Sequence, residues 1–428
     1  MKKMFFFALA AAGMLTACSN DDTLGGNGEQ NVSEQQIRLG VASSKVQTRG
    51  TGTVGGTTDD ENKWAGQTLW VYMLQKGSMD LALYKSPAAG AAAAATTEVF
   101  NNKEFKAPNT ADNTKSGLAT TADGTIAYYP VSGNYDFWGY RVDNAVAGTP
   151  DVKTVNDNGD EVAADQATKR VVAIEIDGSQ DIMAGKAVPS NDEVTALGNY
   201  AENFYSAYAA RKGVQPNITF NHLLTRFTFE VRAGSKATAG LPAGGNTDAV
   251  KVTGVSVDSK TTGTLTVAYT GATKEAADLL TFTGDASALT LKQRDAAVAD
   301  NNAELVGLVP VSLTWTDDAA TIGDVLKVGE ALLVAPGETE YPLTISLSQD
   351  VLKKAGEAKV TMPLEQKATI KMDGGQKFEP GKSYKVTITV YGLEDIRVTA
   401  TLVPWVDGGS IDIDDDRNPN EGTYTPAP

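Results

Sequence analysis

The chain offers few residues of the kinds that perform chemistry. It has 428 residues, with one cysteine, Cys18, and one histidine, His222. A single cysteine excludes an internal disulfide. One cysteine and one histidine are also too few ligands for a zinc site of standard spacing. His222 opens an apolar strand pattern without a serine elbow or a cysteine nearby, so a structural hydrogen bond is a better interpretation than catalysis. We therefore expect no enzyme activity and no metal site.

Two further patterns imitate ligand sites but lack the required context. Residues 50–55 spell G-x-G-x-x-G, yet no strand–helix–strand unit surrounds them, so nucleotide binding is not expected. Asp412, Asp414 and Asp416 have the opening spacing of a calcium loop. Arg417 and Thr423 stand where such a loop needs Gly and Glu. A solvated acidic tail is the better interpretation.

The composition describes a folded, acidic protein. Lys and Arg number 37 and Asp and Glu number 53, giving a formal net charge of −16. Such a surface repels phosphate backbones, so nucleic-acid partners are not expected. Hydrophobic residues make up 41% of the chain, which is enough for packed cores and argues against disorder.

The amino terminus has the pattern of a bacterial export signal. Two lysines precede an apolar stretch from Met4 to Leu15, which is too short to span a bilayer. The stretch ends in Leu15-Thr16-Ala17-Cys18, which resembles the lipobox of bacterial lipoproteins. That resemblance implies that residues 1–17 are a signal peptide and that Cys18 carries a diacylglycerol and an acyl chain. No other cofactor is expected.

The rest of the chain reads mainly as short strands. Ile37, Leu39 and Val41 alternate with polar residues or Gly, as in a half-buried strand. Further strands are predicted over 68–74, 126–129, 135–140, 170–176, 227–231, 252–257 and 265–267, with a hairpin over 384–402. One helix is predicted from the capping box at Ser190–Glu193 through Tyr208, ending at Lys212-Gly213. Each half thus supplies about seven strands, which predicts an all-β fold of two Greek-key sandwiches.

Several patches together resemble the fimbrillin (Mfa-like) family of Bacteroidetes, the subunits of type V pili. The patches are Tyr128-Tyr129-Pro130, Tyr135–Tyr140, Gln180–Met183, Phe220–Arg226, Phe378–Tyr384 and Val403-Pro404-Trp405. Their order over roughly residues 30–410 carries the resemblance. It implies two tandem transthyretin-like β-sandwich domains, export as a lipoprotein, and cleavage after an arginine by a surface protease. Cleavage would release the anchor and the first strand, and a neighbour's strand would fill the vacated position.

Arg49 is the residue that fits this cleavage. It is the basic residue that ends the segment after the 37–41 strand, and Gly50 begins a Gly/Thr-rich stretch that suits a protease. We accordingly divide the chain into a signal peptide, a lipidated tether with the displaced strand, two sandwich domains and an acidic tail. Their ranges are 1–17, 18–49, 50–215, 216–410 and 411–428.

The expected function is that of a structural or adhesive fimbrial subunit. Its partners would be other pilus subunits, the outer membrane before cleavage, and a host or bacterial surface ligand. Ile411 and Ile413 alternate with aspartates and form the candidate donor segment, although two residues fill little space. The alternative is a monomeric glycan-binding lipoprotein of the outer surface, which would need exposed aromatic platforms. Stalk, tip and accessory roles remain open at this point.

Overall fold

The computed structural model describes a set of segments from Gln35 to Ile411. The described residues are 35–43, 68–85, 96–106, 119–120, 127–143, 150–200, 204–234, 250–295, 305–314, 323–351, 358, 360–372, 374–391, 396–403 and 410–411.

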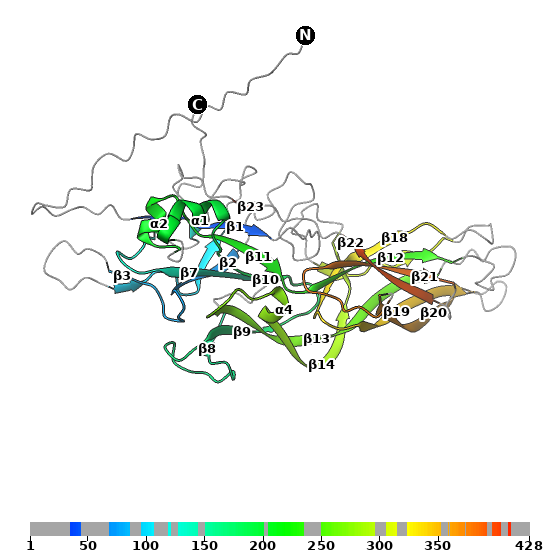
Figure 1. Cartoon of the computed structure of the whole chain (residues 1–428). Helices are drawn as coiled ribbons and strands as arrows, with labels where there is room; N and C mark the ends of the chain where they lie inside the picture. The colour runs from blue at the N-terminus through cyan, green and yellow to red at the C-terminus, as the bar shows by residue number, and fades with distance from the viewer. Residues whose placement is uncertain are drawn as a thin grey trace, which may run out of the picture. The chain divides into compact units, whose positions relative to one another are not determined.

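The largest sheet contains the N-terminal strand and most strands of the first half (Figure 1). Its order is β23 (Ser410–Ile411), β1 (Gly40–Ser43), β11 (Asn217–His222), β10 (Ile182–Lys186), β7 (Tyr135–Val142), β2 (Thr68–Gln75), β5 (Lys103–Lys106) and β6 (Ala119–Thr120). The β1–β11 pair is parallel, and β1 pairs with β23 antiparallel. The predicted strand over 126–129 is instead an isolated bridge, Gln36 to Tyr128.

A four-stranded sheet collects strands from the second half of the chain. Its order is β18 (Leu326–Val334), β12 (Thr225–Ala233), β21 (Ser383–Val390) and β22 (Ile396–Val403). The predicted hairpin is confirmed, because β21 and β22 pair antiparallel from Ser383–Val403 to Val390–Ile396. The alternating valines and isoleucines of β21 are buried, and Val398 and Ala400 of β22 pack against the same core.

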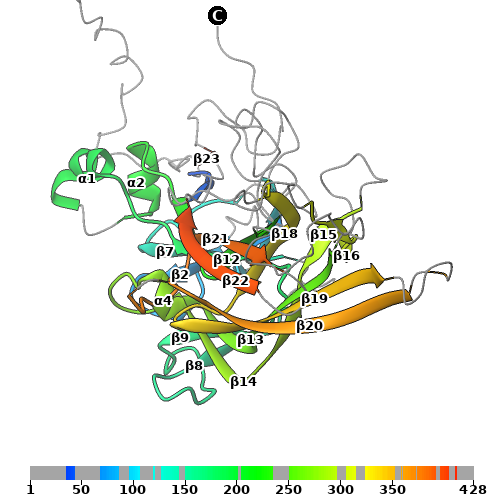
Figure 2. The ribbon, with the colours of Figure 1, turned by 90° about the vertical axis from the view of Figure 1, so that its right-hand side faces the viewer.

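A third sheet combines strands from both halves (Figure 2). Its order is β20 (Val360–Lys371), β19 (Glu340–Val351), β13 (Lys251–Tyr269), β9 (Lys169–Glu175) and β8 (Val152–Val155), with β14 (Leu280–Thr290) and β17 (Val311–Ser312) also paired to β13. Two short pairs complete the described strands: β15 (Lys292–Arg294) with β16 (Leu305–Gly307), and β3 (Leu83–Lys85) with β4 (Thr96–Glu98).

The prediction of two separate strands over 252–257 and 265–267 was wrong. Residues 251–269 form one strand, β13, whose register against its neighbours shifts at three places. The sequence between the predicted strands, Asp258 to Gly263, resembles a turn because it is polar and ends in Gly. Pairing with β14 and β9 supplies backbone hydrogen bonds there, so the chain stays extended.

The helix prediction was correct at its start and wrong in its length. α1 (Asn191–Leu197) begins at the capping box of Ser190 and Glu193, and both reciprocal hydrogen bonds are present. Gly198 then takes a positive φ of 55° and begins a 3₁₀ turn (Gly198–Tyr200). Tyr205 also has a positive φ, 53°, before α2 (Ala207–Arg211) starts. A last short helix, α4 (Ala276–Leu279), precedes β14.

The largest sheet is buried on both faces. In β2, Leu69, Val71 and Met73 enter one hydrophobic core, whereas Trp70, Tyr72 and Leu74 enter another. Strands covered on both faces carry apolar residues at consecutive positions, as β2 and β7 do. The first core contains α1, α2 and the N-terminal strand, and the second lies among all three large sheets.

The fold is all-β with a few short helices, as predicted. The division into domains at residues 215/216 stays a prediction. β9, from the predicted first domain, pairs with β13 over seven residue pairs, from Thr262–Glu175 to Tyr269–Lys169. The sheet therefore crosses that division.

Candidate functional site

The first feature that could carry function is the N-terminal segment, Gln35–Ser43. Its alternating apolar residues are all buried: Ile37 is 4% exposed, Leu39 2% and Val41 0%. They belong to the same core as Phe137 and Phe220 of the largest sheet. The three residues predicted to form a removable first strand thus fill a hydrophobic core.

Residues 127–129 hold one side of this segment. The Ile37 amide donates to the Ala127 carbonyl at 2.8 Å, and the Tyr129 amide donates to the Gln35 carbonyl at 2.9 Å. Tyr129 itself is 3% exposed and lies in the same core. At this end, backbone hydrogen bonds and side-chain packing therefore both hold the segment in place.

Residues 215–220 hold the other side. Gly40 lies opposite Asn217 and Val41 opposite Ile218 in the parallel ladder. The Gly40 amide donates to the Pro216 carbonyl at 3.0 Å. The Gln215 side chain acts as a clamp, because its oxygen accepts from the Arg38 amide and its nitrogen donates to the Gln36 carbonyl, each at 3.2 Å.

The outer edge of the N-terminal segment pairs with β23, a short strand near the C-terminus. Val41 lies opposite Ile411 and Ala42 opposite Ser410 in an antiparallel pair. The candidate displaced strand and the candidate donor segment are thus neighbours in one sheet. Sequence reasoning missed this contact, although both stretches share a two-residue apolar period that could have suggested it.

The remaining predicted site residues lie outside the described residues. These are Cys18, Arg49, Gly50 and Ile413. Lipidation at Cys18 and cleavage between Arg49 and Gly50 therefore stay predictions.

His222 has the structural role expected of it. Its Nδ1 lies 2.7 Å from the Asp181 carboxylate, and both side chains are 1% exposed. The Asp181 amide donates to Asp143, which also pairs with Arg141. Burial raises the pKa of Asp143 to about 7, with Asp181 adding to the rise and Arg141 opposing it. This buried polar cluster joins the ends of β7 and β11 to the loop before β10.

Arg226 extends the polar cluster to the next sheet. Its guanidinium donates to the Ser383 hydroxyl of β21 at 2.9 Å. Burial lowers the pKa of Arg226 to about 10, while Asp181 and Glu330 oppose the decrease. At neutral pH the guanidinium remains charged, so the contact is a charge-assisted hydrogen bond between β12 and β21.

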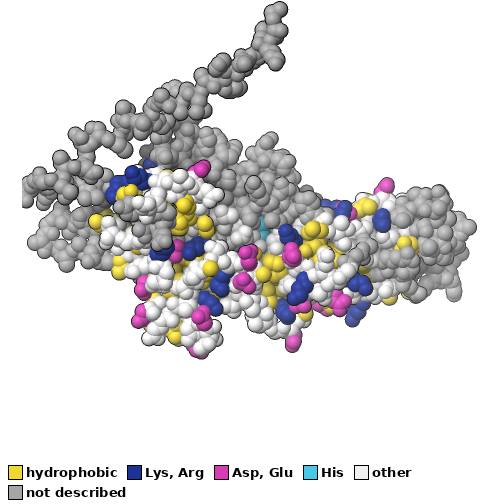
Figure 3. Space-filling view, in the orientation of Figure 1, with side chains coloured by type: hydrophobic (Ala, Val, Ile, Leu, Met, Phe, Trp, Pro, Cys, Tyr) yellow, Lys and Arg dark blue, Asp and Glu magenta, His cyan; other side chains and the backbone are white. Residues whose placement is uncertain are grey.

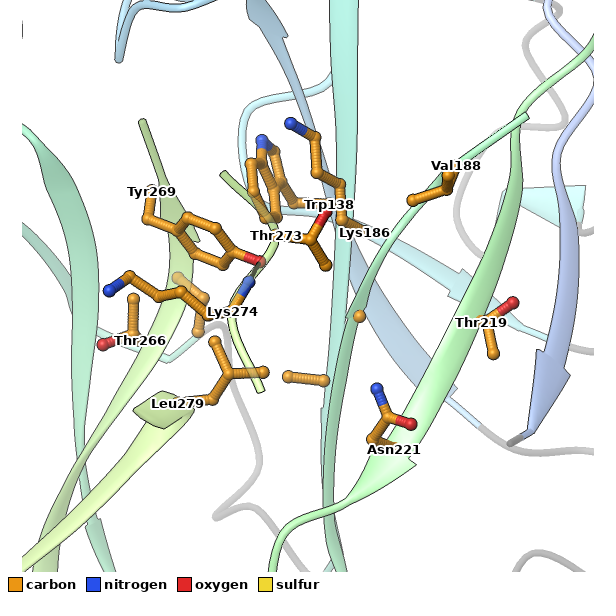
Figure 4. A pocket seen from close by; sticks show the side chains of 13 residues that line it. Trp138, Lys186, Val188, Thr219, Asn221, Thr266, Tyr269, Thr273, Lys274 and Leu279 are labelled. Carbon is orange, nitrogen blue, oxygen red and sulfur yellow. Dashed lines mark hydrogen bonds between the residues drawn. The ribbon is translucent and has the colours of Figure 1, made fainter. Parts of the chain in front are cut away.

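A pocket of about 130 Å³ lies between β10, β11 and β13 (Figure 4). Trp138 and Tyr269 form one wall, with ring centroids 4.2 Å apart, and Lys186 covers the Trp138 ring at 4.4 Å. Trp138 is only 2% exposed, so it offers no stacking platform to a sugar. Trp70 is likewise buried at 5%, and the other tryptophans lie outside the described residues.

Two further findings concern the described part of the chain. No helix in it is long and apolar enough to cross a membrane. No group of three or more His, Cys, Asp or Glu side chains in it is arranged to hold a metal ion.

The comparison with known families agrees with the all-β fold. The fimbrillin-like family matches residues 57–405, which is most of the chain, and the chain belongs to this family. The family resemblance inferred from the sequence patches is therefore confirmed. The match begins after the N-terminal segment and ends before β23.

The chain is also similar to several solved structures, at low sequence identity. One is a protein assigned to cell adhesion from Bacteroides uniformis, with 16% identity, a TM-score of 0.40, and coverage of 87% of this chain and 100% of that chain. Another is the fimbrial anchor protein Mfa2 from Porphyromonas gingivalis, with 9% identity, a TM-score of 0.30, and coverage of 87% and 99%. No curated protein matches the sequence. The assignment therefore rests on the family match.

Proposed function

We propose that the chain is the precursor of a fimbrial subunit that polymerises by exchange of its N-terminal strand. Export as a lipoprotein through Cys18 would bring it to the outer membrane. A cut between Arg49 and Gly50 would then release the anchor and the N-terminal segment together. The cleaved subunit would join a fimbrium at the cell surface.

The observation that carries this proposal is the burial of Ile37, Leu39 and Val41. Each such side chain contributes roughly 1.5–3 kcal/mol when fully buried. The three together contribute about 5–9 kcal/mol, which is comparable with the total stability of many domains. Loss of this segment would expose an apolar core and a row of unpaired backbone groups, which form a template for strand addition.

The covalent connection between the N-terminal segment and the rest of the chain favours retention of the segment in its site. In the uncut chain, residues 44–67 connect the segment covalently to β2 and so keep it close to its site at a high effective concentration. A cut after Arg49 would make its binding intermolecular, so dilution or a competing strand could displace it.

Strand direction favours the exchange. β1 is parallel to β11, and β23 is antiparallel to β1. A C-terminal segment of a second copy that entered the place of β1 in the direction of β23 would be antiparallel to β11. Antiparallel ladders are slightly more stable per residue than parallel ones, which supports replacement of β1 by such a segment.

The proposal is tested by blocking the cut in cells that display the protein. Arg49→Ala should abolish fibres in electron micrographs and remove the ladder of SDS-resistant multimers from unheated surface extracts. Lys45→Ala is the matched control, because it removes a nearby basic residue and leaves the expected cleavage site intact. Fibres and ladders of normal abundance in the Arg49→Ala strain would contradict the proposal.

A further inference from the structure

The parallel ladder between β1 and β11 ends at Gly40, beside Pro216. The Gly40 amide donates to the Pro216 carbonyl at 3.0 Å. One step further toward the amino terminus, a parallel ladder needs the N–H of residue 216. Proline has no N–H, so the regular pattern ends there. The backbone of the N-terminal segment before Gly40 therefore needs another partner on the side of β11.

Val214 holds the next place in that register, but its amide is already used. In the register of β1 and β11, the Val214 N–H would pair with the Gln36 carbonyl and its C=O with the Arg38 amide. The Val214 amide instead donates to the Ala209 carbonyl at 3.0 Å, because the chain there closes the end of α2. The backbone of residue 214 thus leaves these two groups of the N-terminal segment to another partner.

The side chain of Gln215 supplies the donor and the acceptor in place of Val214. Its oxygen accepts from the Arg38 amide and its nitrogen donates to the Gln36 carbonyl, each at 3.2 Å. A carboxamide carries the same kinds of donor and acceptor as a peptide group. Gln215 therefore replaces one residue of a parallel strand with its side chain.

Gln215 is buried, although the residues shortly before it lie at the surface. Arg211 and Lys212, at the end of α2, are exposed, and Figure 3 shows Lys and Arg side chains at the surface over this helix, at the upper left. The Gln215 side chain is only 8% exposed. A buried carboxamide is destabilising unless its groups are hydrogen-bonded. Departure of the N-terminal segment would remove both of these bonds, and a new main chain in the same place would restore them.

We propose that the Gln215 carboxamide is a main-chain receptor, which recognises an extended strand in the place of the N-terminal segment independently of the side chains beside it. This rests on the proposed function in one respect, because the strand that replaces the segment belongs to a partner subunit. That strand carries apolar residues at alternate positions, in the places of Ile37, Leu39 and Val41. It also carries a backbone N–H where it meets Gln215, so proline is excluded at that position.

The carboxamide suits a strand that runs in either direction. A parallel strand presents a C=O and an N–H from residues two apart, as Gln36 and Arg38 do. An antiparallel strand presents both groups from one residue. The oxygen and nitrogen of Gln215 share one carbon at the end of a flexible side chain, and rotation of the last torsion turns them to either arrangement. The same receptor thus serves the present segment and an antiparallel replacement.

The first arm of the test uses the purified uncut chain and hydrogen exchange of single amides. Gln215→Met keeps the length of the side chain and removes both hydrogen-bonding groups. Protection of the Arg38 amide should fall about fivefold, the effect of one hydrogen bond, while protection of the Gly40 amide stays within about twofold of the wild type. Gln293→Met is the control, because it removes a carboxamide that accepts from the Val309 amide elsewhere in the fold. It should leave both amides unchanged.

The second arm uses the chain cut after Arg49 and a synthetic peptide of residues 35–43 as the competing strand. Methylation of the Arg38 nitrogen in the peptide removes the N–H that Gln215 accepts. The methyl group also adds bulk, so the comparison between wild type and Gln215→Met is decisive. The loss of affinity on methylation should be about fivefold larger for the wild-type subunit than for the Gln215→Met subunit.

Each result has a stated meaning. Equal losses of affinity in the two subunits, or an unchanged Arg38 amide in the uncut Gln215→Met chain, would overturn the inference. A cut chain that retains residues 35–43 against about a hundredfold excess of peptide would refute the proposed function. The Arg38 amide of the uncut chain would still decide whether Gln215 holds the main chain. Unchanged protection of the β21 amides shows that the variant is folded.

Discussion

Val41 of β1 and Ile218 of β11 lie opposite one another in a parallel ladder, and both side chains are fully buried. Parallel neighbours need a long connection, and here the connection contains most of the first half of the chain. Within the described residues, departure of the N-terminal segment from this ladder breaks only its pairs with β11 and β23 and its bridge to Tyr128. This geometry gives the N-terminal segment its proposed role as a removable part of the core.

The first prediction concerns Leu39 in the uncut chain. Leu39→Ala should lower the free energy of unfolding by about 2–5 kcal/mol, because it leaves a cavity in a closed core. Leu402→Ala is the control, since Leu402 is 57% exposed and its truncation should cost less than about 0.5 kcal/mol. Urea unfolding monitored by tryptophan fluorescence measures both. Equal effects of the two substitutions would show that the N-terminal segment does not fill the core.

The second prediction concerns the close approach of β10 to β11. A methyl group at Gly185 would overlap the carbonyl oxygen of Thr219, a backbone atom that cannot move aside without breaking the sheet. Gly185→Ala should therefore destabilise the protein by about 3 kcal/mol or prevent folding.

Gly307 provides the matched control for that substitution. Apart from its two chain neighbours, no described residue has an atom within 4 Å of a methyl group placed there, so Gly307→Ala should change stability by less than about 0.5 kcal/mol. Thermal unfolding followed by circular dichroism distinguishes the two variants. A Gly185→Ala protein as stable as the control would refute the close packing of β10 on β11.

The third prediction concerns the pH dependence of stability. The raised pKa of Asp143, about 7, means that the folded state keeps a proton that the unfolded state releases near pH 4. The contribution of Asp143 to stability is therefore fully present below pH 4 and is lost as the pH rises toward 7. The slope is at most about 1.4 kcal/mol per pH unit.

Asp143→Asn isolates this contribution. Denaturant titrations between pH 4.5 and 7.5 should show a smaller loss of stability with rising pH in the variant than in the wild type. The absolute stability of the variant should fall, because Arg141 loses its buried partner. Asp285→Asn, at an exposed position of β14, should leave the slope unchanged. Parallel curves for Asp143→Asn and wild type would contradict the assigned pKa.

The fourth prediction concerns the lipid anchor. Cells grown with labelled palmitate should incorporate the label into the protein, and Cys18→Ala should abolish incorporation because the chain has no other cysteine. Several acyl chains on one residue give firm membrane attachment. Label that persists in the Cys18→Ala protein would exclude lipidation at this residue.

Local patterns in the sequence were sufficient to predict several elements of the fold. The hairpin of β21 and β22 alternates strictly in one stretch of chain, and the capping box of Ser190 and Glu193 fixes the start of α1 within four residues. Burial of Ile37, Leu39 and Val41 also follows from their alternation. In each case the deciding interaction lies close in sequence or depends on one period.

Other features depend on contacts between distant residues. Tyr205 interrupts the predicted helix because its ring packs in the core against Phe137, with ring centroids 5.5 Å apart. Extended pairing with β9 and β14 keeps β13 continuous through a polar stretch that otherwise favours a turn. The contact of Val41 with Ile411 joins the two ends of the described chain. Tertiary packing overrides local preference in all three, so the sequence alone did not predict them.

The amino-terminal sequence of subunits taken from assembled fibres tests the central claim most directly. The account predicts that these subunits begin at Gly50 and lack Ile37, Leu39 and Val41. Fibre subunits that begin at Cys18, or at any residue before Ile37, would retain the strand that must leave and would contradict the account.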